Sequence, residues 1–337
     1  MNKFITEMAR KAKENPQKIA FPESLNRDIL RTAGMVVETG IGFVLLMGNQ
    51  KEIEDLAGQE GISTEGFEYF DCGDEQNRML LADEYSKKYD DFTEKSVLRK
   101  AKDPVRCAMF LLKLGKVDCV AAGKEYSTGD VIFEAMSIVG LKEGVESVSS
   151  LGIADIPGFE GPEGTLLGLA DCAITAQPDA ADLAGIAISS ADTVRTLLGW
   201  EPRLAMLSFS TCGSADHESI DVIREAVMRV RKIRPELSID GEFQLDSAII
   251  GSVAEKKVKW ESKVAGKANV LIFPNLHAGN IGVKMIQIFG RANAYGPVLQ
   301  GFARPVCDFS RSAPVEEMFG NVAMLVIRAG GEKDAYI

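Results

Sequence analysis

The sequence predicts an α/β protein of two domains, each with a mostly parallel sheet covered by helices on both faces. Three observations predict it. The 337 residues exceed what one ordinary core encloses, short apolar runs alternate with longer amphipathic ones, and the composition shifts at 151–171. Hydrophobic residues make up 46% and charged residues 26% of the chain, which is typical of a folded globular protein and not of a disordered one.

Five short apolar runs, rich in Val, Ile, Leu and Phe, predict buried strands. They are residues 18–23, 42–48, 117–123, 203–210 and 268–275. The segment 151–171 differs from them, because glycines and prolines punctuate two extended apolar stretches. This pattern predicts an antiparallel hairpin that opens the second domain.

Two segments between the strands carry a clear helical periodicity, 179–198 and 217–234. Apolar residues recur in them at steps of three and four, namely Leu183, Ile186, Val194, Leu197, Ile220, Ile223, Val227 and Val230. Pro178 and Asp179 suit a helix start. Both segments are therefore predicted to be helices that cover a sheet.

Charge and composition exclude several classes of function. The net charge of −11 argues against a nucleic-acid groove or an anionic membrane surface as the main partner. No run of 18 apolar residues exists, and the charged N-terminal stretch lacks the features of a secretory signal. The six cysteines show no CxxC spacing, which predicts reduced thiols in a cytoplasmic protein. The two histidines have no neighbouring ligand at a metal-binding spacing, so no metal site is expected.

The common catalytic and nucleotide motifs are absent from the sequence. TGIGFV lacks the third glycine of a dinucleotide fingerprint, and no glycine-rich loop ends in Gly-Lys-Ser or Gly-Lys-Thr. No GxSxG elbow accompanies His217, which we interpret as a polar residue at a helix start and not as a catalytic base.

The stretch CDFSRSAPVEE, near the end of the chain, admits two interpretations. In one, Ser312 caps a surface helix, and Glu316 and Glu317 in its first turn favour the helix dipole. In the other, Ser310 and Arg311 form a hydroxyl–guanidinium pair that binds an anion, with a carboxylate base beside it.

Further motifs decide between these interpretations. From residue 171 to 311 the chain reads, in order, DCAI, LSFST with GSA, DGEFQLDSA, FPNLHAGNIG, YGPVLQG and DFSR, with FPE and STGDV upstream. Together they resemble the phosphate acetyltransferase and phosphate butyryltransferase family. The resemblance implies two αβα three-layer domains with a cleft between them, similar to the isocitrate/isopropylmalate dehydrogenase fold. It implies a first domain of residues 1–145 plus 298–337, completed by the C-terminal segment, and a second of 146–297.

The reaction that the resemblance implies moves an acyl group, most simply acetyl, between acyl phosphate and CoA. It needs a base for the thiol and donors for the carbonyl and phosphate oxygens. The resemblance gives these roles to Ser310, Arg311 and Glu317, with Glu316 as the rival base. It also implies CoA, acyl phosphate and phosphate as the substrates, no bound cofactor, and a homodimer.

The resemblance also points to other binding residues. For substrate they are Ser127, Thr128, Gly279, Asn280 and Gln244, and for the CoA phosphates a loosely matching basic element offers Lys87 or Lys88. Lys124 for substrate and Arg291 for CoA are added as replacements for cations that the family usually carries elsewhere. FPNLHAGNIG would form a strand, a turn through Gly279, and a helix starting near Asn280 whose N–H groups face an anion, with His277 lining the cleft. Two plainer interpretations stay open: Lys124 is a solvated surface residue, and Gln244 is a polar residue that satisfies a loop.

The sequence departs from the family at two cationic positions. Phe133 and Ile288 stand where arginines that hold the acyl phosphate and CoA are usual. Lys124 would restore a charge as a point cation, and Arg291, three residues after Ile288, would substitute from a neighbouring part of the helix surface. These departures motivate an alternative, a diverged member without this activity that binds another acylated or phosphorylated metabolite. A dehydrogenase on the related fold is a weaker third possibility.

Overall fold

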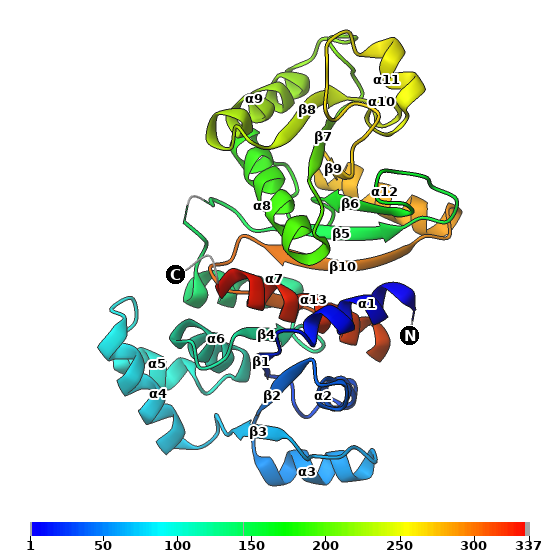
Figure 1. Cartoon of the computed structure of the whole chain (residues 1–337). Helices are drawn as coiled ribbons and strands as arrows, with labels where there is room; N and C mark the ends of the chain where they lie inside the picture. Colours follow the sequence, from blue (N-terminus) through cyan, green and yellow to red (C-terminus); the bar gives the residue numbers. More distant parts are fainter. Residues whose placement is uncertain (1, 144, 334–337) are drawn as a thin grey trace. The chain divides into compact units, whose positions relative to one another are not determined.

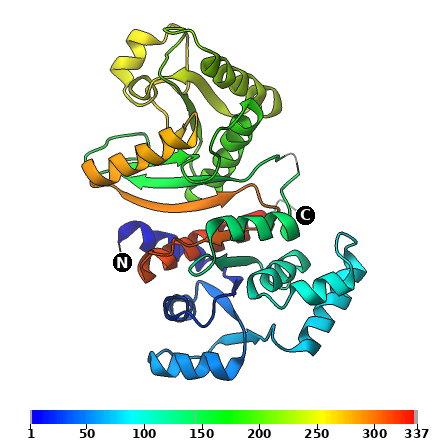
Figure 2. The ribbon, with the colours of Figure 1, turned by 180° about the vertical axis from the view of Figure 1, so that it is seen from behind.

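The computed structural model describes residues 2–143 and 145–333. The chain forms two compact units, Met1–Lys142 with Phe302–Ile337, and Glu143–Gly301 (Figures 1 and 2). Each unit has one sheet covered by helices, which confirms the predicted α/β class. We refer to them as unit 1 and unit 2.

The sheet of unit 1 has five strands in the order β11-β4-β1-β2-β3, and every neighbouring pair is parallel. The strands are β1 Gln17–Phe21, β2 Gly42–Met47, β3 Phe67–Phe70, β4 Cys119–Ala122 and β11 Val306–Asp308. Strand β11 comes from the C-terminal segment and pairs with β4. The last part of the chain therefore completes the sheet that the first part begins.

Helices cover both faces of this sheet, with α2 and α6 on opposite sides in Figures 1 and 2. The helices are α1 Lys3–Ala12, α2 Arg27–Thr39, α3 Gln50–Gln59, α4 Glu75–Lys88, α5 Glu94–Lys100, α6 Pro104–Leu114, α7 Thr128–Glu134 and α13 Val315–Lys333, with a π-helical turn at Ala135–Val139. Because both faces are covered, the central strands are apolar on both sides. Ile19, Ala20 and Phe21 of β1 and every residue of β4 are fully buried.

The sheet of unit 2 has six strands in the order β10-β5-β6-β9-β7-β8. They are β5 Ser149–Asp155, β6 Leu166–Ala170, β7 Arg203–Leu207, β8 Ser238–Phe243, β9 Val270–Ile272 and β10 Asn293–Gln300. Strands β5 and β6 are antiparallel, which confirms the predicted hairpin, and β10 joins β5 in the same manner. The other four strands, β6, β9, β7 and β8, are parallel.

Alternate residues of the unit 2 strands feed two separate cores. Leu204 and Met206 of β7 pack with one pair of helices, α8 Ala180–Leu198 and α9 Glu218–Ile233. Ala205 and Leu207 pack on the opposite face. That face is covered by α10 Leu245–Ile249 and α12 Leu276–Phe289, and α11 Gly251–Lys257 follows α10.

The two helices with the clearest sequence periodicity start where their capping residues predict. The Asp179 carboxylate accepts the N–H groups of Ala181 and Asp182 at the start of α8. The ring of His217 accepts the Ser219 N–H at 3.1 Å at the start of α9, which confirms its interpretation as a helix-start residue.

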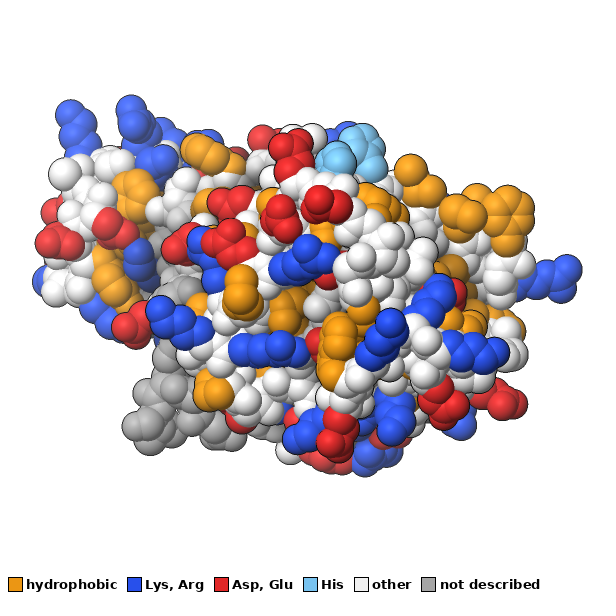
Figure 3. Space-filling model, turned by 90° about the horizontal axis from the view of Figure 1, so that it is seen from above, with side chains coloured by type: hydrophobic (Ala, Val, Ile, Leu, Met, Phe, Trp, Pro, Cys, Tyr) orange, Lys and Arg blue, Asp and Glu red, His pale blue; other side chains and the backbone are white. Residues whose placement is uncertain are grey.

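The structure also bears on the membrane, charge, cysteine and metal expectations drawn from the sequence. No helix within residues 2–143 and 145–333 is long and apolar enough to cross a membrane. Acidic and basic side chains are interspersed over the face drawn in Figure 3. All six cysteines are free thiols and five of them are buried, as predicted. In the described part of the chain, no group of three His, Cys, Asp or Glu side chains is arranged to hold a metal ion.

Candidate functional site

The loop that contains Ser310 and Arg311 is fixed by the pairing of β11 with β4. The two parallel strands end together, with Asp308 opposite Ala122, and the Phe309 N–H donates to the Ala122 carbonyl at 2.7 Å. Gly123 follows with φ of +104°, and a Cβ there would lie 2.1 Å from Asp308 Oδ1. Only glycine permits this approach, so the loops after β4 and β11 lie against each other.

A buried carboxylate holds the loop after β4. Glu23, which is 5% exposed, accepts the backbone N–H groups of Lys124 at 3.0 Å, Glu125 at 2.6 Å and Tyr126 at 2.9 Å. Three successive N–H groups on one carboxylate fix the path of the chain into α7.

The predicted substrate residues Ser127 and Thr128 lie at the start of α7. Ser127 is its N-cap, and its hydroxyl accepts the Asp130 N–H at 3.2 Å and donates to Asp130 Oδ2 at 2.6 Å. Thr128 Oγ1 donates to Asp308 Oδ2 at 2.6 Å. Both hydroxyls therefore have structural partners, and Thr128 ties α7 to the DFSR motif.

Ser310 and Arg311 are exposed at the tip of the loop after β11. Ser310 Oγ lies 3.2 Å from Ser312 Oγ, and its carbonyl accepts the Ala313 N–H at 2.9 Å. Arg311 makes no hydrogen bond or ion pair with any residue that the structure describes, so its guanidinium fork is open to an anion. Helix α13 begins at Val315, three residues after Ser312, and among the described residues the side chain of Ser312 contacts Ser310 and not the helix end.

The two rival carboxylates occupy different environments. Glu316 is exposed and its Oε1 accepts the Asn2 N–H at 3.0 Å. Glu317 is half-buried, and burial raises the pKa of its carboxyl above the ordinary value while the charge of Lys124 partly offsets the rise. A carboxyl whose pKa moves toward neutrality suits proton transfer better than an exposed one.

Lys124 is not a solvated surface residue, so that interpretation is wrong. Its side chain is 9% exposed, and Nζ lies 3.0 Å from Asp28 Oδ2 and donates to the Ala313 carbonyl at 2.8 Å. The ammonium therefore links α2 to the segment between Arg311 and α13. Two of its three donors are engaged within the protein, which leaves little of it for a phosphate.

Asp308 is a residue of this site that the sequence analysis did not single out. It is 4% exposed, and its Oδ1 has no hydrogen-bond partner among the described residues. Burial raises the pKa of this carboxyl to about 6, the Thr128 hydroxyl and Arg311 lower it, and Glu23 raises it. An acidic residue at the carboxyl end of a buried strand, within the DFSR motif, was the available signal.

Replacing Asp308 by asparagine is expected to stabilise the fold at alkaline pH and not at acid pH. The folded protein binds this proton more tightly than the unfolded chain does. The stability that the group contributes is therefore complete below about pH 4 and is lost as the pH rises through about 6. Asp308→Asn should raise the free energy of unfolding by about 2 kcal/mol at pH 8 and change it little at pH 4.

Urea unfolding at the two pH values measures this, with Asp55→Asn, at an exposed position of α3, as the control. An equal effect of Asp308→Asn at both pH values would contradict the assignment.

The DCAI motif of unit 2 lies where strand β6 ends. Asp171 directly follows β6 and is 3% exposed. Its carboxylate accepts the N–H groups of Ala173 at 3.0 Å and Thr175 at 2.7 Å, and also the Ser150 hydroxyl. A Cβ on Gly279 would lie 2.2 Å from the Asp171 carbonyl oxygen, so Gly279 allows α12 to pack against this turn.

The predicted turn at Gly279 and helix start at Asn280 are wrong. Helix α12 begins at Leu276, where the Asn275 side chain accepts the Ala278 N–H at 3.0 Å, so Gly279 and Asn280 lie within the first turns of the helix. Asn280 Nδ2 donates to the Cys172 carbonyl at 3.4 Å, and His277 is exposed.

The remaining candidates are placed as follows. Gln244 is half-buried, and its Oε1 accepts from Lys257 Nζ at 3.0 Å and Thr211 Oγ1 at 3.3 Å, as the plainer interpretation expects. Arg291 does not lie on the surface of α12, which ends at Phe289. It follows the helix in a left-handed conformation with φ of 52°. Lys87, in the last turn of α4, forms an ion pair of 2.6 Å with Asp83.

The two positions where the resemblance expects arginines carry exposed apolar side chains. Phe133 on α7 is 64% exposed and Ile288 on α12 is 70% exposed. Arg106, near Phe133 in the fold, pairs instead with the buried Glu134 at 2.7 Å. Of Arg106 and Arg311, Arg311 is therefore the one whose guanidinium makes no hydrogen bond or ion pair with a described residue.

Comparisons with known proteins give concordant results. The family model described as "Phosphate acetyl/butaryl transferase" matches residues 3–326. A protein from Thermoanaerobacterium thermosaccharolyticum named phosphate acetyltransferase is 40% identical over 335 residues, which cover 97% of this chain and 99% of that protein. A phosphotransacetylase structure from Streptococcus pyogenes has a TM-score of 0.88 at 29% identity, covering 98% of this chain and 99% of that one. The EutD phosphotransacetylase structure from Staphylococcus aureus has a TM-score of 0.85 at 31% identity, covering 96% and 99%.

Proposed function

Because this chain belongs to the phosphate acetyl/butaryl transferase family, we propose that it transfers an acyl group between acyl phosphate and CoA, most simply acetyl. The observation that carries the proposal at the level of residues is the geometry around Arg311. The unpaired guanidinium of Arg311 directly follows Ser310 in a loop that the Thr128–Asp308 hydrogen bond joins to the start of α7. The half-buried carboxylate of Glu317 lies six residues further along the chain.

The proposed chemistry assigns each group one step. Glu317 accepts the proton of the CoA thiol, and the thiolate sulfur attacks the acyl carbonyl carbon. The new C–S bond forms as the bond from the acyl carbon to the phosphate oxygen breaks, and phosphate leaves with the electron pair. Arg311 binds the phosphate oxygens through its planar fork, and Ser310 donates to the oxygen on which negative charge builds.

A direct assay tests the proposal. Purified protein is mixed with CoA and acetyl, propionyl or butyryl phosphate, and thioester formation is followed. Turnover with at least one of them is expected, and the ratio of kcat/KM values gives the acyl preference. Folded protein that turns over none of the three would contradict the proposal and favour the diverged, inactive alternative.

Lys124→Met is expected to lower stability more than it weakens substrate binding. The change removes the nearer cation of Asp28, which keeps Arg31 at 3.7 Å, and it leaves the Ala313 carbonyl without its donor, which should cost about 1–3 kcal/mol of unfolding free energy. The KM for acyl phosphate should change by less than about threefold, because the ammonium is engaged within the protein.

A double-mutant cycle with Asp28→Asn supplies the control, and the loss in the double variant should be smaller than the sum of the single losses. A rise in KM of more than about tenfold at unchanged stability would instead assign Lys124 to the phosphate.

The domain limits, the other binding residues and the cellular location predicted from the sequence remain proposals. We propose domains of 1–145 with 298–337 and of 146–297, which the limits of units 1 and 2 support. We propose Arg291 and Lys87 as contacts of the CoA phosphates, and Gln244, Asn280, Gly279, Ser127 and Thr128 as lining the substrate site. The reduced thiols support a cytoplasmic location.

We also propose a homodimer, supported by an apolar stripe on α12. Ile281, Met285, Ile288 and Phe289 are 56%, 52%, 70% and 79% exposed, at spacings that place them on one side of the helix. A second copy of the chain would cover them. Phe289→Glu should shift the mass measured by analytical ultracentrifugation from dimer to monomer. A monomeric parent protein at micromolar concentration would contradict the dimer.

A further inference from the structure

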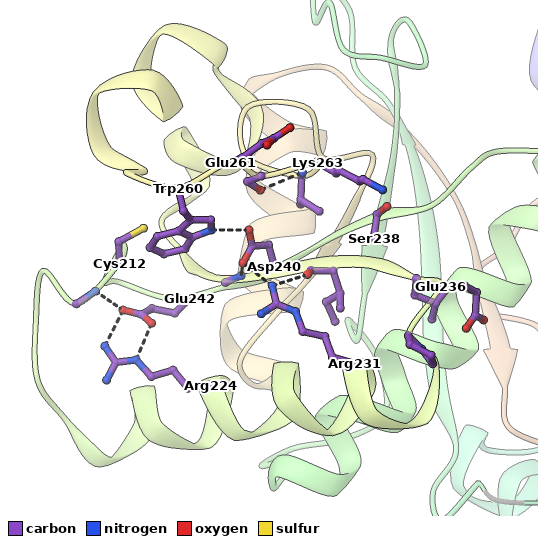
Figure 4. Close-up of a pocket in the computed structure, with 17 residues that line it drawn as sticks. Cys212, Arg224, Arg231, Glu236, Ser238, Asp240, Glu242, Trp260, Glu261 and Lys263 are labelled. Atoms are coloured by element: carbon purple, nitrogen blue, oxygen red, sulfur yellow. Dashed lines mark hydrogen bonds and ion pairs between the residues drawn. The ribbon is translucent and has the colours of Figure 1, made fainter.

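Unit 2 contains a cavity of about 800 Å³ beside β8, one of the two edge strands of its sheet (Figure 4). Its walls come from Arg224 and Arg231 of α9, from residues 235–242, which include most of β8, from the segment 260–264, and from Cys212 and Gly213 of the loop after β7. The volume falls in the range of small-molecule sites. None of the residues proposed above for acyl transfer lines it.

The wall made by Trp260 is held by a buried carboxylate. The indole Nε1 donates to Asp240 Oδ2 at 3.1 Å, and Asp240 is 5% exposed. Arg231 Nη2 donates to Asp240 Oδ1 at 3.0 Å and to the Ile239 carbonyl at 3.1 Å. The indole, 47% exposed, is therefore oriented by its edge while much of its surface stays open (Figure 4).

A second ion pair fixes Glu242, which lies two residues after Asp240 on β8. Arg224 donates through Nε to Glu242 Oε2 at 2.8 Å and through Nη2 to Oε1 at 3.0 Å. Glu242 Oε1 also accepts the Ser210 hydroxyl at 2.8 Å and the Gly213 N–H at 2.9 Å. Burial opposes its ionisation, but these donors lower the pKa of the Glu242 carboxyl to about 2. The Arg224–Glu242 ion pair therefore keeps both of its charges over the physiological pH range.

The cavity has hydrogen-bond donors that the lining carboxylates do not use. Asp240 and Glu242 are each matched by an arginine, and Glu236 by Arg234 at 2.5 Å. No described residue accepts from Nε or Nη1 of Arg231. Two backbone groups in the middle of β8 already have hydrogen-bond partners. The Ile239 carbonyl accepts from Arg231, and the Gly241 N–H donates to Asp240 Oδ1 at 3.0 Å. An extended peptide would have to displace these bonds to add a strand.

We propose that this cavity binds a nucleoside phosphate. The base stacks on the indole of Trp260, and the phosphates accept from the three unused N–H groups on Nε and Nη1 of Arg231 and from the exposed ammonium of Lys263 at the rim. Glu261 is the one lining carboxylate without a cation among the described residues, and it turns to solvent at the mouth. A ligand of this class needs both a flat ring and an anionic group, and the cavity supplies a partner for each.

Isothermal titration calorimetry with ADP, adenosine and pyrophosphate tests this on the full chain. ADP should bind one site per chain, and more tightly than either fragment. Trp260→Ala and Arg231→Gln should each weaken ADP binding by at least about tenfold, while Trp260→Phe, which keeps a ring, changes it less than about threefold. Arg229→Gln is the matched control, an exposed arginine of the same helix that pairs with Glu225. Fluorescence of a Trp200→Phe protein, in which Trp260 is the remaining tryptophan, should be quenched by ADP.

The outcome is independent of acyl transfer. Arg311→Ala, Arg291→Ala and Lys87→Ala should leave the affinity for ADP unchanged. ADP binding that depends on Arg291 or Lys87, and not on Trp260 or Arg231, would place ADP at the proposed CoA site and overturn the inference. So would the absence of binding at concentrations up to about 10 mM, or pyrophosphate binding as tightly as ADP.

Discussion

Arg311→Ala is expected to lower kcat/KM for acyl phosphate by about 10²–10³-fold. The guanidinium makes no hydrogen bond or ion pair with a described residue, so its donors are available to the substrate phosphate, and within the protein its charge acts on the Asp308 carboxyl. Phe133 and Ile288 offer no charge where the family resemblance expects arginines, and Lys124 is engaged by Asp28. Steady-state kinetics in the direction of acyl-CoA formation measure the loss.

Two further variants make the Arg311 result specific. Arg311→Lys should recover only about a tenth of the loss or less, because an ammonium cannot bind two phosphate oxygens in a planar fork. Arg99→Ala, at an exposed position of α5, should keep the parent kcat/KM and report any general effect of removing a cation. If Arg311→Ala retained more than about a third of the activity, the phosphate would have to be held elsewhere.

The elements that bury apolar residues continuously are predictable from the sequence, although their limits are not. The apolar run 203–210 predicts β7, which ends at Leu207 because the chain then leaves the sheet for the loop that holds Ser210. The run 268–275 contains only a three-residue strand, β9. An apolar run reports burial, whereas a strand also needs a neighbour for its backbone hydrogen bonds, and that neighbour comes from elsewhere in the chain.

The two wrong predictions at the site, at Gly279 and Lys124, also arise from neighbours that are distant in the sequence. Gly279 predicts a turn when only its neighbours in sequence are considered, but it is a glycine because α12 packs against the Asp171 carbonyl. Lys124 has polar neighbours and is expected to be solvated, but Asp28 and Ala313, distant in sequence, bury its ammonium. The Ser310–Arg311 pair could be identified because motifs are local, whereas partners that fold in from other segments leave no local pattern.

Glu317→Gln is expected to lower kcat for acyl-CoA formation by about 10²–10⁴-fold near neutral pH, and Glu316→Gln by less than about threefold. Glutamine keeps the shape of the side chain and removes the base. Glu317 is half-buried with a raised carboxyl pKa, whereas Glu316 is exposed and bonded to the Asn2 N–H. The two variants differ by one position on the same helix, so each is the matched control for the other.

The pH dependence distinguishes a base from a residue that only positions the substrate. A base acts in its ionised form, so the raised pKa of Glu317 moves the acid limb of the parent profile above the range of an ordinary carboxyl. In Glu317→Gln that limb should disappear, and activity should rise with pH as the CoA thiol ionises without help, near the ordinary thiol pKa of about 8.5. The ratio of parent to variant kcat should therefore shrink above that pH. A ratio that stays constant with pH would assign Glu317 a positioning role. A larger loss of activity in Glu316→Gln than in Glu317→Gln would identify Glu316 as the base.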